Sequence, residues 1–203
     1  PYGLGYQKAA VLPSSPEQPF LRISLSGKVV ETNLIGAYNA DNVMAAIAVG
    51  AQFGVSFDEA AAAIASYVPS NNRSQMVRTQ RNTLIVDAYN ANPTSMEAAL
   101  KNFAALQAEH KAVLLGDMLE LGEDSIAEHV RIAAMALDSG FETVCFVGAE
   151  FRKAVGQLSG TQARVFDTSA HLASWLSEHQ LEGFSCLIKG SRGTRMEKVI
   201  ETL

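Results

Sequence analysis

The second half of the chain alternates short apolar runs with stretches in which apolar residues recur every three to four positions. Five apolar runs have the length of strands: 84–86, 112–115, 143–147, 164–166 and 186–188. The helical spacing predicts five helices: 93–109, 125–139, 150–158, 169–180 and 193–202. Continuous apolar strands that alternate with helices are typical of a parallel sheet covered on both faces. We therefore expect an α/β, Rossmann-like fold with a mostly parallel sheet, and a short antiparallel strand over 74–79 beside it.

The first part of the chain has a different rhythm. Apolar residues alternate with polar ones over 21–25, Ser26-Gly27 can turn the chain, and 28–32 can return as the partner of a β-hairpin. Helical spacing then covers 39–54, and Ser56 opens a second helix with a capping box. The polar stretch from Pro69 to Asn72 separates the two rhythms. This predicts two domains, 1–71 and 72–203.

The stretch from Thr83 to Leu100 predicts a buried strand, a polar turn and an amphipathic helix. Asn92 can cap this helix and Pro93 suits its first position, whereas Thr94 with Glu97 offers a competing capping box. The turn between strand and helix carries polar side chains. In open α/β sheets, ligands bind at the carboxyl ends of the strands, so we expect a binding site at this turn.

Each of the five apolar strands ends in a polar residue or Gly, and right-handed crossovers would bring these ends to one edge: Asp87, Gly116-Asp117, Gly148, Asp167 and Lys189-Gly190. Asp87 could accept a ribose hydroxyl or organise a cation, and the alternative is a cap on the following turn. Lys189, Ser191 and Arg192 precede a predicted helix, where cations and free N–H groups attract a carboxylate or a phosphate. The alternative for this segment is a solvated basic turn.

The segment from Gly116 to His129 is harder to interpret. Asp117 could bind a ligand or position a neighbouring cation. Glu120 and Glu123 could be ligands, but a solvated acidic loop fits them equally well. His129 lies at helical spacing with apolar neighbours, which favours a satisfied, partly buried histidine.

Three further residues allow both a functional and a plain interpretation. Arg73 could reach a phosphate across an interdomain cleft, or it could be an ordinary surface arginine. Asn39 and Asn42 share one face at the start of a helix, where they could contact a base edge or cap the helix.

Composition narrows the class of protein. The 203 residues carry a formal charge of −5, which argues against nucleic-acid binding and against anionic membranes. No apolar run approaches the roughly 18 residues of a membrane span, and no signal peptide is evident. Cys145 and Cys186 lack metal-site spacing, so we expect buried, reduced thiols and no metal site within this chain. Because the sequence starts without Met, in the middle of what could be a strand, we expect a fragment of a longer protein. No phosphate-binding GxxxxGK[ST] is present.

Five segments together resemble the Mur ligases over about residues 20–203: IGAYNADNVMAA, NNRSQM, DAYNANPTSMEAAL, LLGDMLELGE and IKGSRGTRMEKV. The most similar member of the family adds D-alanyl-D-alanine to a UDP-N-acetylmuramoyl-tripeptide in peptidoglycan synthesis. The resemblance implies an ATP-dependent amide ligase that works through an acyl phosphate. Residues 1–71 would be the end of its central ATP-binding domain and 72–203 its C-terminal domain. The phosphate-binding loop and the Mg²⁺ ligands would lie upstream, so we expect this chain alone to be inactive.

The resemblance also implies roles for individual residues. Those matched to ATP binding are Asn39, Asn42, Arg73, Asp87 and Tyr89, although Tyr38 stands where the family often has His. Those matched to the acceptor D-alanyl-D-alanine are Asn90, Asn92, Lys189, Ser191 and Arg192. Arg73 and Lys189 would act in catalysis, whereas Asp117 and His129 match family positions without an assigned role. The implied partners are small molecules, and the implied protein is a cytoplasmic, bacterial monomer that binds no nucleic acid and inserts into no membrane.

Alternatives remain at this point. Another Mur-type ligase would use a different amino-acid acceptor. Asp87, Asp117 and Lys189 also loosely resemble the acidic pocket and lysine of a non-catalytic phospho-receiver domain, although the β-rich start and the Ala-rich helices do not fit it. A dinucleotide-binding domain would need a GxGxxG after a strand, and the sequence has none.

Overall fold

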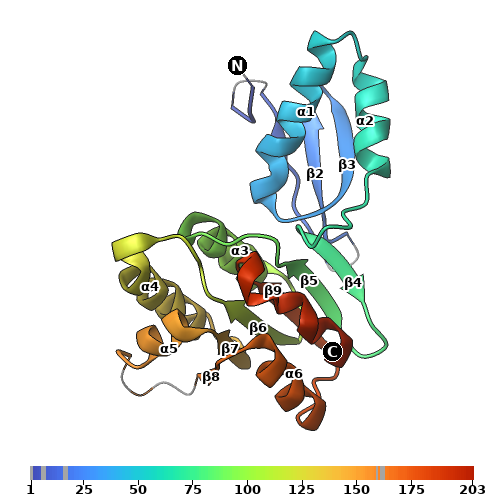
Figure 1. Ribbon diagram of the computed structural model, residues 1–203. Coiled ribbons are helices and arrows are strands. Elements are labelled where there is room, and N and C mark those ends of the chain that lie inside the picture. Colours follow the sequence, from blue (N-terminus) through green and yellow to red (C-terminus); the bar gives the residue numbers. More distant parts are fainter. Residues whose placement is uncertain (1, 6–7, 16–17, 159, 161–162) are drawn as a thin grey trace. The chain divides into compact units, whose positions relative to one another are not determined.

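The computed structural model describes residues 2–5, 8–15, 18–158, 160 and 163–203. The chain divides into two compact units, Pro1–Ser70 and Asn71–Leu203, hereafter the first and the second unit (Figure 1). The division falls inside the polar stretch between Pro69 and Asn72. Each unit has its own sheet and its own buried cluster, so each is described by itself.

The first unit is a three-stranded antiparallel sheet followed by two helices. Its elements are β1 Ala10–Val11, β2 Phe20–Leu25, β3 Lys28–Ile35, a 3₁₀ turn Ala37–Asn39, α1 Ala40–Gln52 and α2 Phe57–Ser66. Ser26 and Gly27 both have positive φ, as the tight turn between β2 and β3 requires. Ser56 and Glu59 form the predicted capping box of α2. Apolar side chains from the strands and both helices form one buried cluster. The predicted hairpin and two helices are confirmed.

The second unit is built on a six-stranded sheet. Its strands are β4 Gln75–Arg78, β5 Thr83–Asp87, β6 His110–Gly116, β7 Thr143–Val147, β8 Arg164–Phe166 and β9 Phe184–Lys189. Their order across the sheet is β4-β5-β9-β6-β7-β8. Only β4 runs antiparallel to its neighbour; the other strands are parallel. The mostly parallel sheet predicted from the apolar runs is confirmed.

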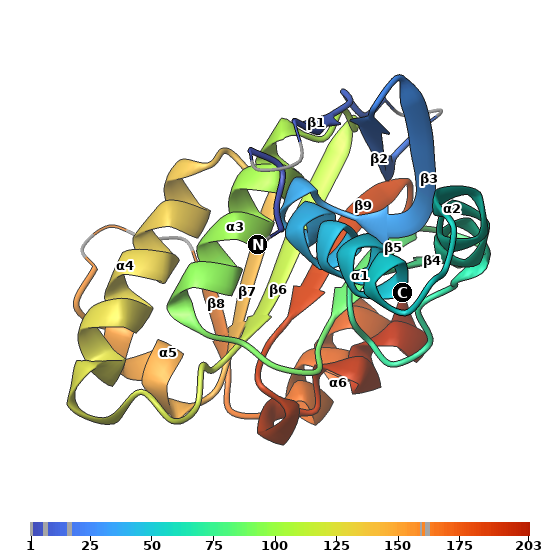
Figure 2. The same cartoon turned by 90° about the horizontal axis from the view of Figure 1, so that it is seen from above.

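Helices cover both faces of this sheet. They are α3 Pro93–Ala105, α4 Ser125–Asp138, α5 Ala149–Val155 and α6 Ser169–Glu178. Figures 1 and 2 show α3 and α4 on one face, and α6 with the C-terminal segment on the other. On the α6 face, Leu172 and Met196 pack with Leu84 and Val86 in one buried cluster. On the α3 face, Phe151 of α5 stacks on Phe146 of β7 at 4.6 Å between ring centroids.

Two of the predicted helices were wrong in detail. The helix expected over 193–202 is instead two 3₁₀ segments, Arg192–Thr194 and Met196–Thr202, because Arg195 between them has a left-handed backbone with φ 51°. The helix expected over 93–109 ends at Ala105, since Leu106 is extended. Its capping box uses Asn92 with Ser95, and not the competing pair.

The strand order also excludes one alternative, the phospho-receiver domain. Numbered along the chain, the five parallel strands lie in the order 1-5-2-3-4, with the last strand inserted between the first and the second. Flavodoxin-like folds, which include receiver domains, have the order 2-1-3-4-5. The second unit is therefore not a receiver module.

Candidate functional site

The candidate site lies where neighbouring strands of the second unit end. Asp87 at the end of β5 is the register partner of Lys189 at the end of β9, and Lys189 also pairs with Leu115 near the end of β6. The loops that follow these strands, residues 88–92, 190–194 and 117–124, therefore leave the sheet at the same edge. This is the edge at which parallel α/β sheets bind ligands.

Asp87 and Lys189, which the sequence matched to different ligands, form an ion pair. Lys189 Nζ lies 2.5 Å from Asp87 Oδ2 and also donates to the carbonyl of Asn90 at 3.3 Å. The second carboxylate oxygen of Asp87 accepts the backbone N–H of Ser74 at 3.2 Å. Lys189 is only 1% exposed, so its charge is held inside the protein. The pair thus ties the segment after Arg73 to β5 and β9.

Two arginines lie against the ring of Tyr89 at the surface of this edge. The guanidinium carbon of Arg73 is 3.7 Å from the ring centroid, and that of Arg192 is 5.5 Å from it. Both arginines are exposed, and Tyr89 is 37% exposed. Within the described part of the chain, neither guanidinium lies within 4.0 Å of a carboxylate. The group Arg73–Tyr89–Arg192 therefore offers two uncompensated cations to an anionic ligand.

The two asparagines of the 88–92 loop shape the backbone around them. Asn92 Oδ1 accepts the N–H of Ser95 at 2.8 Å, and the Ser95 hydroxyl accepts the N–H of Asn92 at 3.1 Å, which caps α3 as predicted. Asn90 Oδ1 accepts the N–H of Ala91 at 2.9 Å. Both residues are exposed.

Ser191 is buried and hydrogen-bonds the loop after β9 to the other two loops. It is 4% exposed. Its hydroxyl accepts the N–H of Leu119 at 2.9 Å and donates to the carbonyl of Ala91 at 3.4 Å. Its own N–H donates to the carbonyl of Asp117 at 3.1 Å. Leu119 was not singled out by sequence reasoning, although it lies inside the GDMLELG segment; its half-exposed side chain lies against Gly193.

Asp117 and His129 lie behind this edge. The Asp117 carboxylate accepts the backbone N–H groups of Glu150 at 3.0 Å and Phe151 at 2.9 Å, at the start of α5. His129 Nε2 accepts the N–H of Met118 at 3.0 Å, and its Nδ1 is 2.7 Å from the carbonyl of Ser125. A backbone N–H can only donate and a carbonyl can only accept, so these contacts place the ring proton on Nδ1. His129 is satisfied, as predicted, but fully buried.

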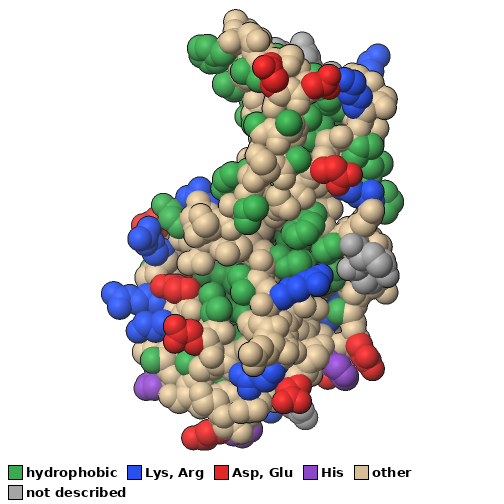
Figure 3. Space-filling view, turned by 90° about the vertical axis from the view of Figure 1, so that its right-hand side faces the viewer, with side chains coloured by type: hydrophobic (Ala, Val, Ile, Leu, Met, Phe, Trp, Pro, Cys, Tyr) green, Lys and Arg blue, Asp and Glu red, His purple; other side chains and the backbone are tan. Residues whose placement is uncertain are grey.

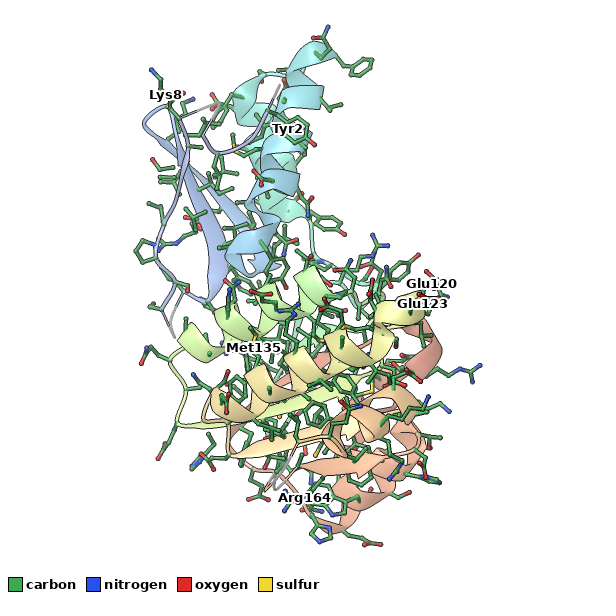
Figure 4. The ribbon with its side chains drawn as sticks, turned by 90° about the vertical axis from the view of Figure 1, so that its left-hand side faces the viewer. Tyr2, Lys8, Glu120, Glu123, Met135 and Arg164 are labelled. Atoms are coloured by element: carbon green, nitrogen blue, oxygen red, sulfur yellow. The ribbon has the colours of Figure 1, made fainter. Side chains whose placement is uncertain are left out.

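The two glutamates of the 117–124 loop face outward. Glu120 and Glu123 lie near one another before α4 (Figure 4) and are exposed, which matches a solvated acidic loop. Among the residues that the structure describes, no three His, Cys, Asp or Glu side chains lie together so as to hold a metal ion.

Asn39 and Asn42 belong to the first unit. Asn39 is buried and donates from Nδ2 to the carbonyl of Ile35 at 2.9 Å; it makes no side-chain cap on α1. Asn42 is exposed and donates to Asn39 Oδ1 at 3.2 Å. The two amides thus share one face, as their spacing predicts.

Both cysteines are buried in the sheet of the second unit and unpaired with each other. Burial raises the pKa of Cys145 and of Cys186 to about 12. These thiols therefore have the inert character expected from their strand positions.

Surface charge and hydropathy do not define the candidate site further. Acidic and basic side chains are interspersed on the face in Figure 3. In the described part of the chain, no helix combines the length and the apolar character that crossing a bilayer requires.

The sequence of the second unit matches a known protein family. Residues 72–192 match the family described as "Mur ligase, glutamate ligase domain". A UDP-N-acetylmuramoyl-tripeptide–D-alanyl-D-alanine ligase from Treponema pallidum is 36% identical over 182 residues. That match covers 88% of this chain and 39% of the relative, so the chain spans about two fifths of the relative's length.

Solved structures give the same fold. MurF from Acinetobacter baumannii superposes with a TM-score of 0.79 at 27% identity, and the match covers 96% of this chain and 43% of that one. MurF ligase from Thermotoga maritima, solved in complex with ADP, has a TM-score of 0.75 at 19% identity over 96% of this chain and 45% of that one.

Proposed function

Because the chain belongs to the Mur ligase family, we propose that it is part of an ATP-dependent amide ligase that joins D-alanyl-D-alanine to a UDP-N-acetylmuramoyl-tripeptide. The name of the Treponema relative supports this substrate pair. The observation that carries the proposal is the group Arg73–Tyr89–Arg192 above the Asp87–Lys189 ion pair. It presents two free cations at the edge where a nucleotide phosphate and a peptide carboxylate must both be held.

We assign residues 1–71 to the end of a central ATP-binding domain and residues 72–203 to the C-terminal domain of this ligase. The chain would act as a cytoplasmic enzyme on small molecules. ATP is a substrate of the proposed reaction, and the ADP complex of the Thermotoga protein supports a nucleotide site in this family. Mg²⁺ would accompany ATP, and among the described residues no three His, Cys, Asp or Glu side chains lie together to hold it.

On the nucleotide side, Arg73 would bind a phosphate of ATP, because its exposed guanidinium has a fork of donors that matches phosphate oxygens. Asp87 would accept a ribose hydroxyl; its carboxylate is held in place by Lys189 and the Ser74 N–H. Tyr89 would flank the nucleotide. In the first unit, Asn39 and Asn42 would contact the adenine edge through their amides.

On the acceptor side, Arg192 would bind the carboxylate of D-alanyl-D-alanine, and Asn90 and Asn92 would hydrogen-bond its peptide group. The burial of Lys189 and Ser191 favours indirect roles for both. Lys189 would fix Asp87 and place a positive charge beneath the reacting groups, and Ser191 would hold the loop that carries Arg192.

The reaction proceeds in two steps. The terminal phosphoryl group of ATP passes to a carboxylate oxygen of the tripeptide, which gives an acyl phosphate and ADP. The amine of D-alanyl-D-alanine then attacks the acyl carbon, loses a proton, and the C–O bond to phosphate breaks to release inorganic phosphate. Arg73 would stabilise charge on the phosphoryl group, and Arg192 would place the amine for attack.

Direct binding to the 203-residue chain tests the two halves of the site separately. In NMR titrations, ATP should shift the amides around Arg73 and Tyr89, and D-alanyl-D-alanine those of residues 90–92 and 189–192. Arg73→Ala should weaken ATP binding and Arg192→Ala should weaken dipeptide binding, each about tenfold or more, since a charge-assisted hydrogen bond contributes about 1.5–3 kcal/mol. Arg78→Ala is the matched control, because exposed Arg78 lies opposite Thr83 at the other end of β5. Equal losses in all three variants would reject the assignment.

Activity requires a longer protein. A chimera in which residues 72–203 replace the matching part of the Acinetobacter enzyme should release phosphate from ATP only with tripeptide and D-alanyl-D-alanine present. Arg192→Ala in the chimera should raise the KM for the dipeptide more than that for ATP. A chimera that prefers a single amino acid, such as L-lysine or L-glutamate, would favour a Mur-type ligase with another acceptor.

A further inference from the structure

We propose that His129, Asp117 and Ser191 are positioning residues. Their hydrogen bonds fix the backbone of residues 189–192 and thereby the direction in which the Arg192 side chain leaves it. The inference rests on the proposed function only for the identity of the ligand that Arg192 meets. It gives a physical task to three side chains that are buried and hydrogen-bonded within the protein.

The first link joins His129 to the 117–119 loop. Its Nδ1–H is committed to the Ser125 carbonyl, which leaves the Nε2 lone pair to accept the N–H of Met118 at 3.0 Å. The ring is fully buried and packs edge-on against Phe151 with 4.7 Å between centroids. A buried backbone N–H needs an acceptor, so His129 selects the conformation in which Met118 N–H points toward α4.

The second link joins the 117–119 loop to the loop after β9. Leu119 donates its N–H to Ser191 Oγ at 2.9 Å, and the Ser191 N–H donates to the carbonyl of Asp117 at 3.1 Å. The Ser191 hydroxyl also reaches Ala91, which lies in the same loop as Tyr89. Ser191 thereby fixes the starting direction of Arg192, the residue that follows it.

The third link anchors Asp117 itself. Its carboxylate accepts two N–H groups at the start of α5, and its backbone N–H donates to Val147 at 3.0 Å. Gly148 has φ +121°, and a Cβ built there would meet the Asp117 carboxylate at 2.1–2.6 Å. Only glycine leaves room for this carboxylate, so Asp117 is locked between β6 and α5.

Close packing of the strand ends removes the remaining freedom. A Cβ on Gly116 would meet Thr194 Oγ1 at 2.5 Å, and one on Gly190 would meet it at 2.7 Å. The Thr194 hydroxyl donates to the Ser191 carbonyl at 2.6 Å. The backbone on both sides of Arg192 is therefore held, although its side chain is exposed. A binding group mounted on a fixed backbone loses less entropy when it meets its ligand.

Two substitutions at one position separate positioning from simple stability. The carbonyl of Gln in His129→Gln can reach Met118 N–H in place of Nε2, whereas the shorter side chain of His129→Asn cannot. Ile132→Ala is the control, since Ile132 is equally buried in the same helix. The readouts on the 203-residue chain are amide hydrogen exchange at Met118 and Leu119, and the NMR shift of the Arg192 side chain, which the Tyr89 ring current perturbs.

His129→Asn should speed exchange at Met118 and Leu119 about tenfold or more, as expected for loss of one buried hydrogen bond, and should move the Arg192 signal. His129→Gln should restore both readouts, and Ile132→Ala should change neither beyond its effect on global unfolding. Identical profiles for His129→Asn and Ile132→Ala, or an unmoved Arg192 signal, would overturn the inference. If His129→Asn does not fold, Ser191→Ala supplies the same test at Leu119 and Arg192.

A titration with D-alanyl-D-alanine connects the network to ligand binding. His129→Asn should weaken binding in the wild-type background and add nothing in an Arg192→Ala background. An equal loss in both backgrounds would refute positioning through Arg192. If the wild-type chain does not bind the dipeptide, the proposed function fails, while the exchange and chemical-shift readouts still decide the inference.

Discussion

A buried lysine needs a partner, and Lys189 has one. An unpaired ammonium group is costly to bury, so the Lys189 side chain is stable in its place only with the Asp87 carboxylate beside it. Buried ion pairs add little net stability, because the desolvation of both charges offsets their attraction. The pair is better understood as a device that fixes where the Asp87 carboxylate points.

We predict that Lys189→Met destabilises the chain by about 3–5 kcal/mol, because it leaves the Asp87 carboxylate largely buried without its cation. The double variant Asp87→Asn with Lys189→Met should recover much of that loss, since no uncompensated charge remains. Urea denaturation measures both, with exposed Lys198→Met as the control. Additive losses in the double variant would show that the two side chains do not interact.

The cysteines allow a second prediction at this scale. Because both thiols are buried and their pKa is raised to about 12, they should not react with a thiol reagent at pH 8 while the protein is folded. The reaction rate should follow the unfolding rate as urea is added. Rapid labelling of native protein would contradict the burial of Cys145 and Cys186.

Asn92 at the start of α3 has a structural role as the N-cap of the helix and a proposed role in binding D-alanyl-D-alanine. We predict that Asn92→Ala lowers stability by about 1 kcal/mol, the usual cost of losing an N-cap. Asn92→Asp should keep the cap, and its charge suits a helix N-terminus, but it should repel the carboxylate of D-alanyl-D-alanine. Thermal unfolding and dipeptide titration of both variants distinguish the roles. Unchanged dipeptide affinity in Asn92→Asp would leave Asn92 as a cap alone.

The start of β6 carries a pH-dependent contact. His110 Nδ1 lies 2.8 Å from Glu142 in the connection before β7, and this hydrogen bond raises the pKa of His110. The protonated form is therefore favoured by folding. The stabilisation should be present below about pH 6.5, the unperturbed value, and lost as pH rises through the raised pKa. The melting temperature of Glu142→Gln should fall below wild type at pH 5.5 and match it at pH 8.5. Equal differences at both pH values would reject this origin.

Most elements could be predicted from sequence because their signals are local. Apolar runs mark the buried parallel strands, Asn92-Pro93 marks the start of α3, and Ser56 with Glu59 marks the start of α2. The edge that carries Asp87 and Lys189 follows from the handedness of crossovers, without knowledge of the strand order.

Contacts that depend on strand order or turn geometry could not be predicted. Asp87 and Lys189 are 102 residues apart, and they meet only because β9 inserts beside β5. His129 was placed on the apolar face of its helix by spacing, but its partner Met118 is set by a turn with no periodic signal. The left-handed Arg195 that splits the C-terminal segment has no local signature either, since non-glycine residues rarely adopt that conformation.

At the scale of the whole molecule, the chain divides into two compact units, each with its own buried apolar residues. We predict two unfolding transitions in urea, with the smaller first unit unfolding at the lower concentration, because small units bury a smaller share of their surface. Met44→Ala should shift only the first transition and Leu100→Ala only the second, each by about 2–5 kcal/mol. Circular dichroism and hydrogen exchange measure both. A single transition shifted by either variant would show that the units unfold together.

The central place of β9 has a consequence for how the protein is made on the ribosome. Its hydrogen-bonding partners, β5 from Thr83 and β6 from His110, are both synthesised well before β9 begins at Phe184, and they do not pair with each other. Until residues 184–189 leave the exit tunnel, β5 and β6 each have an unpaired edge that β9 covers in the finished sheet, and such edges pair with other chains. Completion of the sheet, and with it the meeting of Asp87 and Lys189, must therefore wait until residues 184–189 have been translated.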